Sequence, residues 1–259
     1  MFVSVRTCLV SLVVLSGCAS APVICESTVP VSRVVPGAVF VANGAGNFQV
    51  TTKALRNVID MDCQPLEVIT FDWSHGKYRI LADQIGKAHA REQGKRLADA
   101  VVTYHAHNPE RPIYLIGHSA GASVVMAALE NLPESVVTRA VLLAPSLSAE
   151  YDVRAALCSV RESLHVFYSR NDYFYLGLAT DIVGTPDHRW TASAGRVGFR
   201  IENPNPQDCE MYNKLQQHGW RPDDRALGHN GGHFGVYQPN FLRAQVIPLF
   251  NDIKEPRMQ

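Results

Sequence analysis

The chain has 259 residues, of which 46% are hydrophobic, and its 24 basic and 24 acidic residues give a formal net charge of zero. This length and apolar content suit one α/β domain with a substantial core. A balanced charge argues against nucleic-acid binding, because long-range attraction of a polyanion requires a strongly basic surface.

Residues 1–18 have the features of an export signal. Arg6 precedes an apolar stretch over Leu9–Leu15 that is too short to span a bilayer. The sequence Leu15-Ser16-Gly17-Cys18 resembles the lipobox of bacterial lipoproteins, which implies that Cys18 is lipidated, becomes the first mature residue and anchors the protein to a membrane. Ala19 after this cysteine implies the periplasmic side of the outer membrane if the organism is Gram-negative. The alternative is an ordinary secretory signal cleaved near Ala19 or Ala21, which gives a secreted protein.

A tether and a short strand follow the signal. Residues 19–37 contain Pro22, Pro30 and Pro36 without a clear period, which predicts a tether rather than a folded segment. The run Gly37–Ala42 predicts a buried strand, and Asn43-Gly44-Ala45-Gly46-Asn47 forms a turn after it. Small residues let backbone N–H groups point at a developing negative charge, although a plain glycine-rich turn is the alternative interpretation.

The strongest motif is Gly117-His118-Ser119-Ala120-Gly121. It follows an apolar run over Ile113–Ile116 and precedes Ala120–Leu129, which is rich in Ala, Val, Met and Leu at helical spacing. A strand, a tight turn and a helix in this order expose a serine hydroxyl above the carboxyl edge of a sheet. The alternative is that Ser119 merely caps the helix.

Hydrophobic patterning predicts the other elements. Further strands are expected over Leu66–Phe71, Ala140–Pro145, Leu164–Tyr168 and Arg196–Ile201. Helices are expected over Thr52–Met61, Leu81–Tyr104, Asp152–Val160 and Phe241–Ile253. Residues 202–228 hold several prolines and many polar groups, and we expect them to form an excursion over the active face.

With its strand–turn–helix around Ser119, the chain resembles the α/β-hydrolase fold enzymes, and Gly117–Gly121 is similar to their nucleophile elbow. The resemblance covers roughly residues 38–253 and assigns residues 38–259 to one such domain. It implies an α/β fold with a mostly parallel sheet and helices on both faces. Because the first two strands of the full fold are not visible, we expect about six strands.

The resemblance also implies a catalytic triad. The family places its acid after the strand that matches Leu164–Tyr168, which selects Asp172, with Asp181 and Asp187 as alternates. It places its histidine before the terminal helix, which selects His233 in the loop Gly228–Phe234, with His229 as runner-up. The order Ser119, Asp172, His233 is the α/β-hydrolase order.

No metal or organic cofactor is expected from these residues. Gly231 and Gly232 keep His229 and His233 off a helix, and no cluster of Cys, Asp or Glu accompanies the two histidines.

The family resemblance suggests which groups surround the substrate. It implies that the N–H groups of Ala45 and Ala120 form the oxyanion hole, although this chain has Asn43-Gly44 where His-Gly is commoner. Trp73 follows the strand Leu66–Phe71 and is expected at the same sheet edge as Ser119, either lining the cleft or simply packing. Tyr173 begins an apolar cluster that is expected to form part of the pocket wall.

Taken together, these features predict an exported serine hydrolase that cleaves a small-molecule or lipid carboxylic ester through an acyl-enzyme. The alternatives are an acyltransferase or amidase with the same triad, or a non-catalytic envelope scaffold.

The cysteines lead to a separate expectation, because an exported chain meets oxidising conditions. We expect Cys25–Cys63 to be the likelier bridge, since both residues precede strands at the sheet edge away from the active site. The pairing of Cys158 with Cys209 follows only by elimination.

Overall fold

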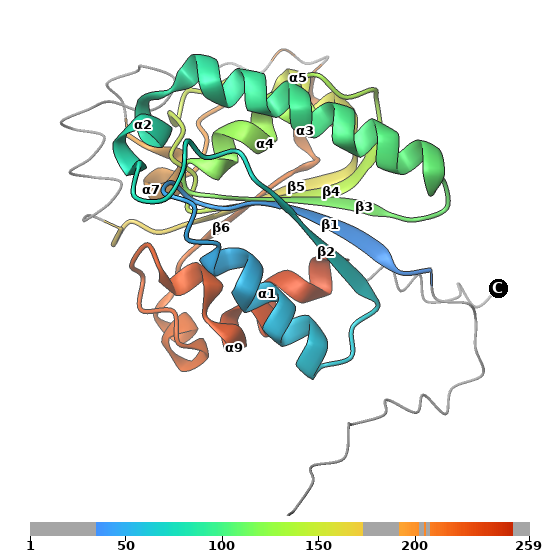
Figure 1. The fold of residues 1–259 in the computed structure, drawn as a ribbon. Coiled ribbons are helices and arrows are strands. Elements are labelled where there is room, and N and C mark those ends of the chain that lie inside the picture. Colours follow the sequence, from blue (N-terminus) through green and yellow to red (C-terminus); the bar gives the residue numbers. More distant parts are fainter. Residues whose placement is uncertain (1–34, 173–191, 202–204, 206–207, 251–259) are drawn as a thin grey trace, which may run out of the picture. The chain divides into compact units, whose positions relative to one another are not determined.

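A computed structural model describes residues 35–172, 192–201, 205 and 208–250 (Figure 1). The described residues therefore do not include five positions with predicted roles, namely Cys18, Cys25, Tyr173, Asp181 and Asp187. None of the described helices combines the length and the apolar character that a membrane span requires.

The described residues form a six-stranded sheet in the order β2-β1-β3-β4-β5-β6, in which every neighbouring pair is parallel. The strands are β1 (Gly37–Ala42), β2 (Leu66–Phe71), β3 (Ile113–His118), β4 (Val137–Leu143), β5 (Val160–Tyr168) and β6 (Leu215–Gly219). The predicted α/β fold with a mostly parallel sheet of about six strands is confirmed.

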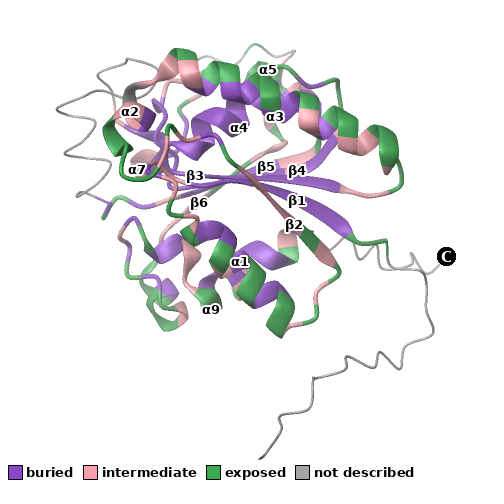
Figure 2. Ribbon diagram, viewed as in Figure 1, coloured by how far each residue is buried: buried purple, intermediate pink, exposed green. Residues whose placement is uncertain are grey.

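Helices cover both faces of this sheet (Figure 1). One face packs against α3 (Lys87–His107), α4 (Gly121–Leu129) and α5 (Arg154–Ser159), and the other packs against α1 (Val50–Met61) and the C-terminal segment. Central strands are buried on both faces, so β1 and β3 are apolar along nearly their whole length (Figure 2). Alternate residues of β1, such as Val39 and Phe40, enter opposite cores.

The helix expected over Leu81–Tyr104 is two helices. A short α2 (Ile80–Ile85) ends at Gly86, whose φ of −79° and ψ of 65° are not helical, and α3 continues from Lys87. The break sets α2 beside the carboxyl edge of the sheet while α3 packs along its face (Figure 1).

The prediction of a strand over Arg196–Ile201 is wrong. Residues Ala194–Val197 form the helical turn α7, which Ser193 caps by accepting a hydrogen bond from the Gly195 N–H, and which ends at Gly198 with φ 78°. The last strand is β6, inside the polar stretch that was expected to be an excursion. As an edge strand, β6 is only partly buried, so its sequence lacks the apolar run that marks the central strands.

The C-terminal part is helical but irregular, so the single helix expected over Phe241–Ile253 is only partly confirmed. After a 3-10 turn over Pro222–Leu227 and another over Gly235–Tyr237, the chain forms α9 (Pro239–Phe241), a π-helical turn (Leu242–Val246) and a 3-10 turn (Ile247–Phe250).

The predicted pairing of Cys158 with Cys209 is also wrong, because both are free thiols. The Cys209 thiol, in the short helix α8 (Cys209–Tyr212), instead lies 3.7 Å from the Asn205 carbonyl oxygen. Because Cys25 lies outside the described residues, the Cys25–Cys63 bridge stays a prediction.

Candidate active site

Ser119 occupies the tight turn between β3 and α4, as the motif predicted. Its φ of 52° lies in the left-handed region. The turn requires glycine at position 121, because a Cβ there would lie 2.3 Å from the Ala42 carbonyl oxygen at the end of β1. This close approach brings the start of α4 directly against the sheet.

The Ser119 turn is tied to the loop after β4. The Ser119 N–H donates to the Leu143 carbonyl at 3.0 Å, and the Ser146 N–H donates to the Ser119 carbonyl at 3.1 Å. The two hydroxyl oxygens of Ser119 and Ser146 lie 3.2 Å apart in a hydrogen bond. Sequence analysis missed Ser146, although its position just beyond a strand end could have suggested it.

Asp172 and His233 form the second half of the candidate site. Asp172 follows β5, and its Oδ2 lies 2.7 Å from Nδ1 of His233, with both side chains at most 4% exposed. A carboxylate at neutral pH only accepts hydrogen bonds, so Nδ1 carries the proton of a neutral ring and Nε2 is left as the acceptor. This geometry brings together two of the predicted residues.

His229 has a different environment from His233. Its Nδ1 accepts a hydrogen bond from the Gly231 N–H at 3.1 Å, and its ring meets that of Phe241 edge-on with centroids 4.7 Å apart. Burial lowers the pKa of His229 to about 4, which keeps the ring neutral at physiological pH. His229 therefore packs in the protein interior and does not line the cavity that contains Ser119.

His118, directly before Ser119, is a buried residue that sequence analysis did not single out. Its ring centroid lies 5.1 Å from that of His233, and neither of its ring nitrogens has a hydrogen-bond partner in the described part of the chain. Burial, followed by the nearby His233, lowers the pKa of His118 to about 3. His118 is therefore neutral at physiological pH.

The turn after β1 lies against the Ser119 turn. A Cβ on Gly44 would come within 2.9 Å of Nδ1 of His118, so glycine is needed for this approach. Asn43 anchors the turn to α1, because its side chain donates to Thr52 Oγ1 at 2.8 Å and accepts from the Thr52 N–H at 3.1 Å. This paired contact explains what asparagine does at a position where the family more often has histidine.

Of the two predicted N–H donors, one belongs to the cavity lining and the other is adjacent to Ser119 in the chain. Ala45 lines the same cavity as Ser119. Ala120 directly precedes α4, and the first N–H groups of a helix have no acceptor within it.

Trp73 is buried behind the turn after β1 and does not line the cavity. Its Nε1 donates to the Asn43 carbonyl at 2.8 Å, and only 3% of the residue is exposed. Its contact is therefore with the backbone of the turn.

A cavity of about 340 Å³ opens over Ser119 and His233. Its apolar wall comes from three places in the sequence: the turn after β1 with the start of α1, the helix α2, and Phe234 directly after His233. The wall residues are Ala45, Phe48, Val50, Ile80, Leu81 and Phe234. All except Ala45 are large side chains that remain exposed, from 39% for Val50 to 61% for Leu81. Among the described residues that line this cavity, none is Lys, Arg, Asp or Glu.

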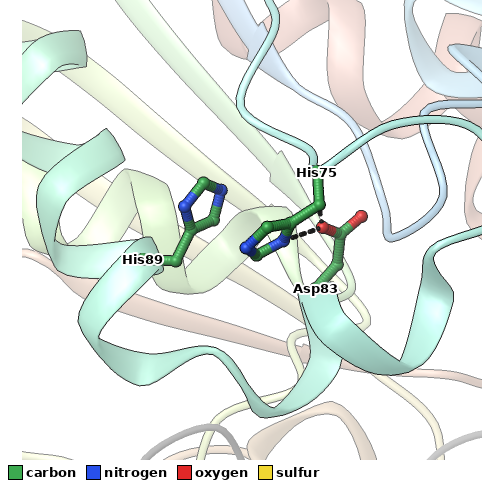
Figure 3. A group of neighbouring side chains, drawn as sticks. All are labelled: His75, Asp83 and His89. Carbon is green, nitrogen blue, oxygen red and sulfur yellow. Dashed lines mark hydrogen bonds and ion pairs between the residues drawn. The ribbon is translucent and has the colours of Figure 1, made fainter.

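Within the described ranges, one group of side chains has the spacing of a possible metal site, namely His75, Asp83 and His89 (Figure 3). The atoms that face one another are already hydrogen-bonded. His75 Nδ1 lies 2.8 Å from Asp83 Oδ1, and His89 Nε2 lies 2.6 Å from the Trp73 carbonyl oxygen. His75 and Asp83 are thus hydrogen-bonded to each other, whereas His89 stacks on His75 and is hydrogen-bonded to Trp73.

Comparison with known proteins bears on the fold. A model of the alpha/beta hydrolase family matches residues 35–248. A poly(3-hydroxybutyrate) depolymerase from Bordetella parapertussis is 12% identical, with a TM-score of 0.50 and coverage of 82% of each chain. A Bacillus licheniformis lipase is also 12% identical, with a TM-score of 0.48 and coverage of 87% of this chain and 96% of its own. No curated protein matches the chain.

Proposed function

The chain belongs to the alpha/beta hydrolase family, and we propose that it is an exported serine hydrolase that cleaves carboxylic esters with an apolar acyl group. One observation carries the proposal: Ser119 and the His233 of a buried Asp–His pair line one cavity. The fold alone would support many hydrolytic reactions, so the proposal rests on this site.

In the proposed reaction His233 Nε2 takes the proton of the Ser119 hydroxyl, whose oxygen attacks the acyl carbon. The new C–O bond forms as the carbonyl π electrons move onto oxygen, giving a tetrahedral oxyanion. The N–H groups of Ala45 and Ala120 stabilise that oxyanion by pointing at the charge as it develops. Collapse of the intermediate expels the alcohol, which receives the proton from His233. A water molecule, activated by the same histidine, then releases the acid from Ser119.

Asp172 has a distinct role in this scheme. Its buried carboxylate accepts from His233 Nδ1, which fixes the tautomer and stabilises the imidazolium that forms during each proton transfer. His118 does not compete for the proton, because its pKa of about 3 keeps it neutral.

The wall of the cavity favours an apolar acyl chain. Transfer of apolar surface from water to Phe48, Val50, Ile80 and Leu81 stabilises the complex by about 25 cal/mol for each Å² removed from water. A charged acyl group would lose its hydration there without meeting an opposite charge among the lining residues that the structure describes.

A lipid anchor at Cys18 completes the proposal. It would hold the enzyme at a membrane surface of the cell envelope, where esters with apolar chains are concentrated. This part rests on the lipobox sequence alone.

The proposal is tested with p-nitrophenyl esters of increasing acyl length, using the wild-type domain and Ser119→Ala. We expect kcat/KM to rise from the acetyl ester to longer acyl chains, and Ser119→Ala to lose hydrolysis while its melting temperature stays close to wild type. A fluorophosphonate probe should label the wild-type protein and not the variant. Wild-type protein that neither hydrolyses esters nor reacts with the probe would favour the non-catalytic scaffold instead.

A further inference from the structure

The side chains of His75, Asp83 and His89 form a cluster (Figure 3) that is joined to the turn Asn43–Gly46, directly through Asp83 and Gly46 and indirectly through His89 and Trp73. We propose that Asp83 is a positioning residue that holds this turn in place, so that the Ala45 N–H faces the developing oxyanion. The inference rests on the proposed function, because it assigns a role in that reaction to a residue that does not touch the substrate.

Asp83 makes an unusually complete set of contacts for an aspartate. Its side chain is fully buried. Oδ2 accepts from the Gly46 N–H at 2.8 Å and from the Ser74 hydroxyl at 2.5 Å. Oδ1 accepts from the N–H of His75 at 2.9 Å and from Nδ1 of His75 at 2.8 Å. Burial raises the pKa of this carboxyl, but the hydrogen bonds together lower it below its ordinary value, so the group is charged at neutral pH.

The turn is held by a hydrogen bond at each of its ends. At one end Gly46 donates to Asp83. At the other end the Asn43 carbonyl accepts from Trp73 Nε1, and the Trp73 carbonyl lies 2.6 Å from Nε2 of His89. Ala45 sits between these two anchors, so its N–H direction depends on both. A reacting group misplaced by about 1 Å can cost about a hundredfold in rate.

The hydrogen bonds of the cluster of His75, Asp83 and His89 favour a role in positioning the turn over a role in metal binding. A metal ligand needs a free lone pair directed at the ion. Each Asp83 oxygen already accepts two hydrogen bonds. The rings of His75 and His89 are stacked, with centroids 3.7 Å apart.

The segment that carries Asp83 also contributes to the cavity. Ile80 and Leu81 of α2 belong to the apolar wall, and Asp83 follows them in the same helix. The Asp83 carboxylate therefore links two parts of the proposed site. One is α2, whose Ile80 and Leu81 contact the acyl chain, and the other is the turn Asn43–Gly46, which faces the acyl carbonyl.

The test compares Asp83→Asn with Ser74→Ala. An amide has a single acceptor oxygen, so Asp83→Asn cannot accept from the Gly46 N–H and the His75 N–H together, and its NH₂ must face one of these two backbone donors. Ser74→Ala removes another partner of the same carboxylate but leaves the Gly46 contact. We expect Asp83→Asn to lower kcat on a short-chain ester about 10- to 100-fold with KM changed less than about twofold. Ser74→Ala should keep kcat within about twofold of wild type.

A second variant covers the outcome in which Asp83→Asn does not fold. Trp73→Phe removes the hydrogen bond at the other end of the turn and should give the same loss in kcat. The Gly46 amide resonance in an ¹⁵N-labelled sample gives a direct readout, since it should move upfield and exchange faster in Asp83→Asn but not in Ser74→Ala.

The possible results separate this inference from the proposed function. If wild-type protein is active, Ser119→Ala is inactive, and both Asp83→Asn and Trp73→Phe keep wild-type kcat, the positioning role is wrong while the ester hydrolase stands. Loss of activity on treatment with EDTA, restored by Zn²⁺, would also overturn it in favour of a metal site. Absence of wild-type hydrolysis would instead refute the proposed function.

Discussion

Replacing Asp172 with Asn should almost abolish hydrolysis without unfolding the protein, and the surroundings of the carboxylate indicate why. In the wild type, Oδ2 accepts from His233 Nδ1 at 2.7 Å, while Oδ1 has no hydrogen-bond partner among the described residues. An asparagine at this position has two orientations. One keeps its oxygen on His233 and buries an NH₂ group without a partner. The other presents the NH₂ to His233.

The free-energy difference between these orientations favours the inactive one. A buried donor without a partner costs about 1–3 kcal/mol, whereas the bare oxygen of the second orientation is already tolerated in the wild type. With NH₂ facing Nδ1, the ring must carry its proton on Nε2, where Ser119 needs an acceptor. Together with the lost stabilisation of the imidazolium, we expect kcat/KM to fall on the order of 10³- to 10⁴-fold, as the corresponding exchange does in serine proteases.

The assay measures initial rates on a short-chain p-nitrophenyl ester, with thermal melts of each variant. Asp224→Asn is the matched control, because Asp224 is also buried and accepts a backbone hydrogen bond, from Arg221 at 2.8 Å, but does not line the cavity. We expect the control to keep kcat/KM within about threefold. An Asp172→Asn variant within about tenfold of wild type would refute the reasoning. If Asp187→Asn were then inactive, the acid would lie at position 187.

Three further predictions concern other parts of the chain. His233→Ala should lose as much activity as Ser119→Ala, and the double variant should be scarcely worse, because groups that act as a unit are non-additive; additive losses would contradict the triad. Cys18→Ser should move the protein from the membrane to the soluble fraction of cells, and an unchanged distribution would rule out the anchor. Burial lowers the pKa of His118 to about 3 and of His229 to about 4 from an ordinary 6.5, so the unfolded chain takes up protons first and the melting temperature should fall as pH drops from about 6.5 to 4. A melting temperature that is constant over this range would show that the two rings are not held neutral.

The central part of the fold was predictable because its physical signal is local. Buried parallel strands such as β1 and β3 are continuous apolar runs, and the turn at Ser119 needs glycine within two residues on either side. Asp172 and His233, which the structure brings into contact, could be singled out because Asp172 follows a recognisable strand and His233 precedes a helical segment.

The failures come from residues whose environment depends on distant parts of the chain. The polar sequence of β6 indicates a strand only once its place at the sheet edge, beside β5, is known. Ser146 and Asp83 contact Ser119 and Gly46 across 27 and 37 positions of sequence, which no local pattern reveals. The alternating apolar residues of Arg196–Ile201 indicated a strand, but the cap at Ser193 formed a helical turn there instead.

The left-handed backbone of Ser119 has a consequence for how this protein could evolve. Residues with a Cβ adopt a φ near 52° at a cost of roughly 1–2 kcal/mol, which glycine avoids. Exchange of Ser119 for glycine should therefore raise thermal stability while abolishing hydrolysis, whereas exchange for alanine should not stabilise the chain. At position 119, therefore, the residue that favours folding is glycine, whereas the residue that turnover requires is serine. A lineage released from selection for activity is expected to lose its serine to glycine early.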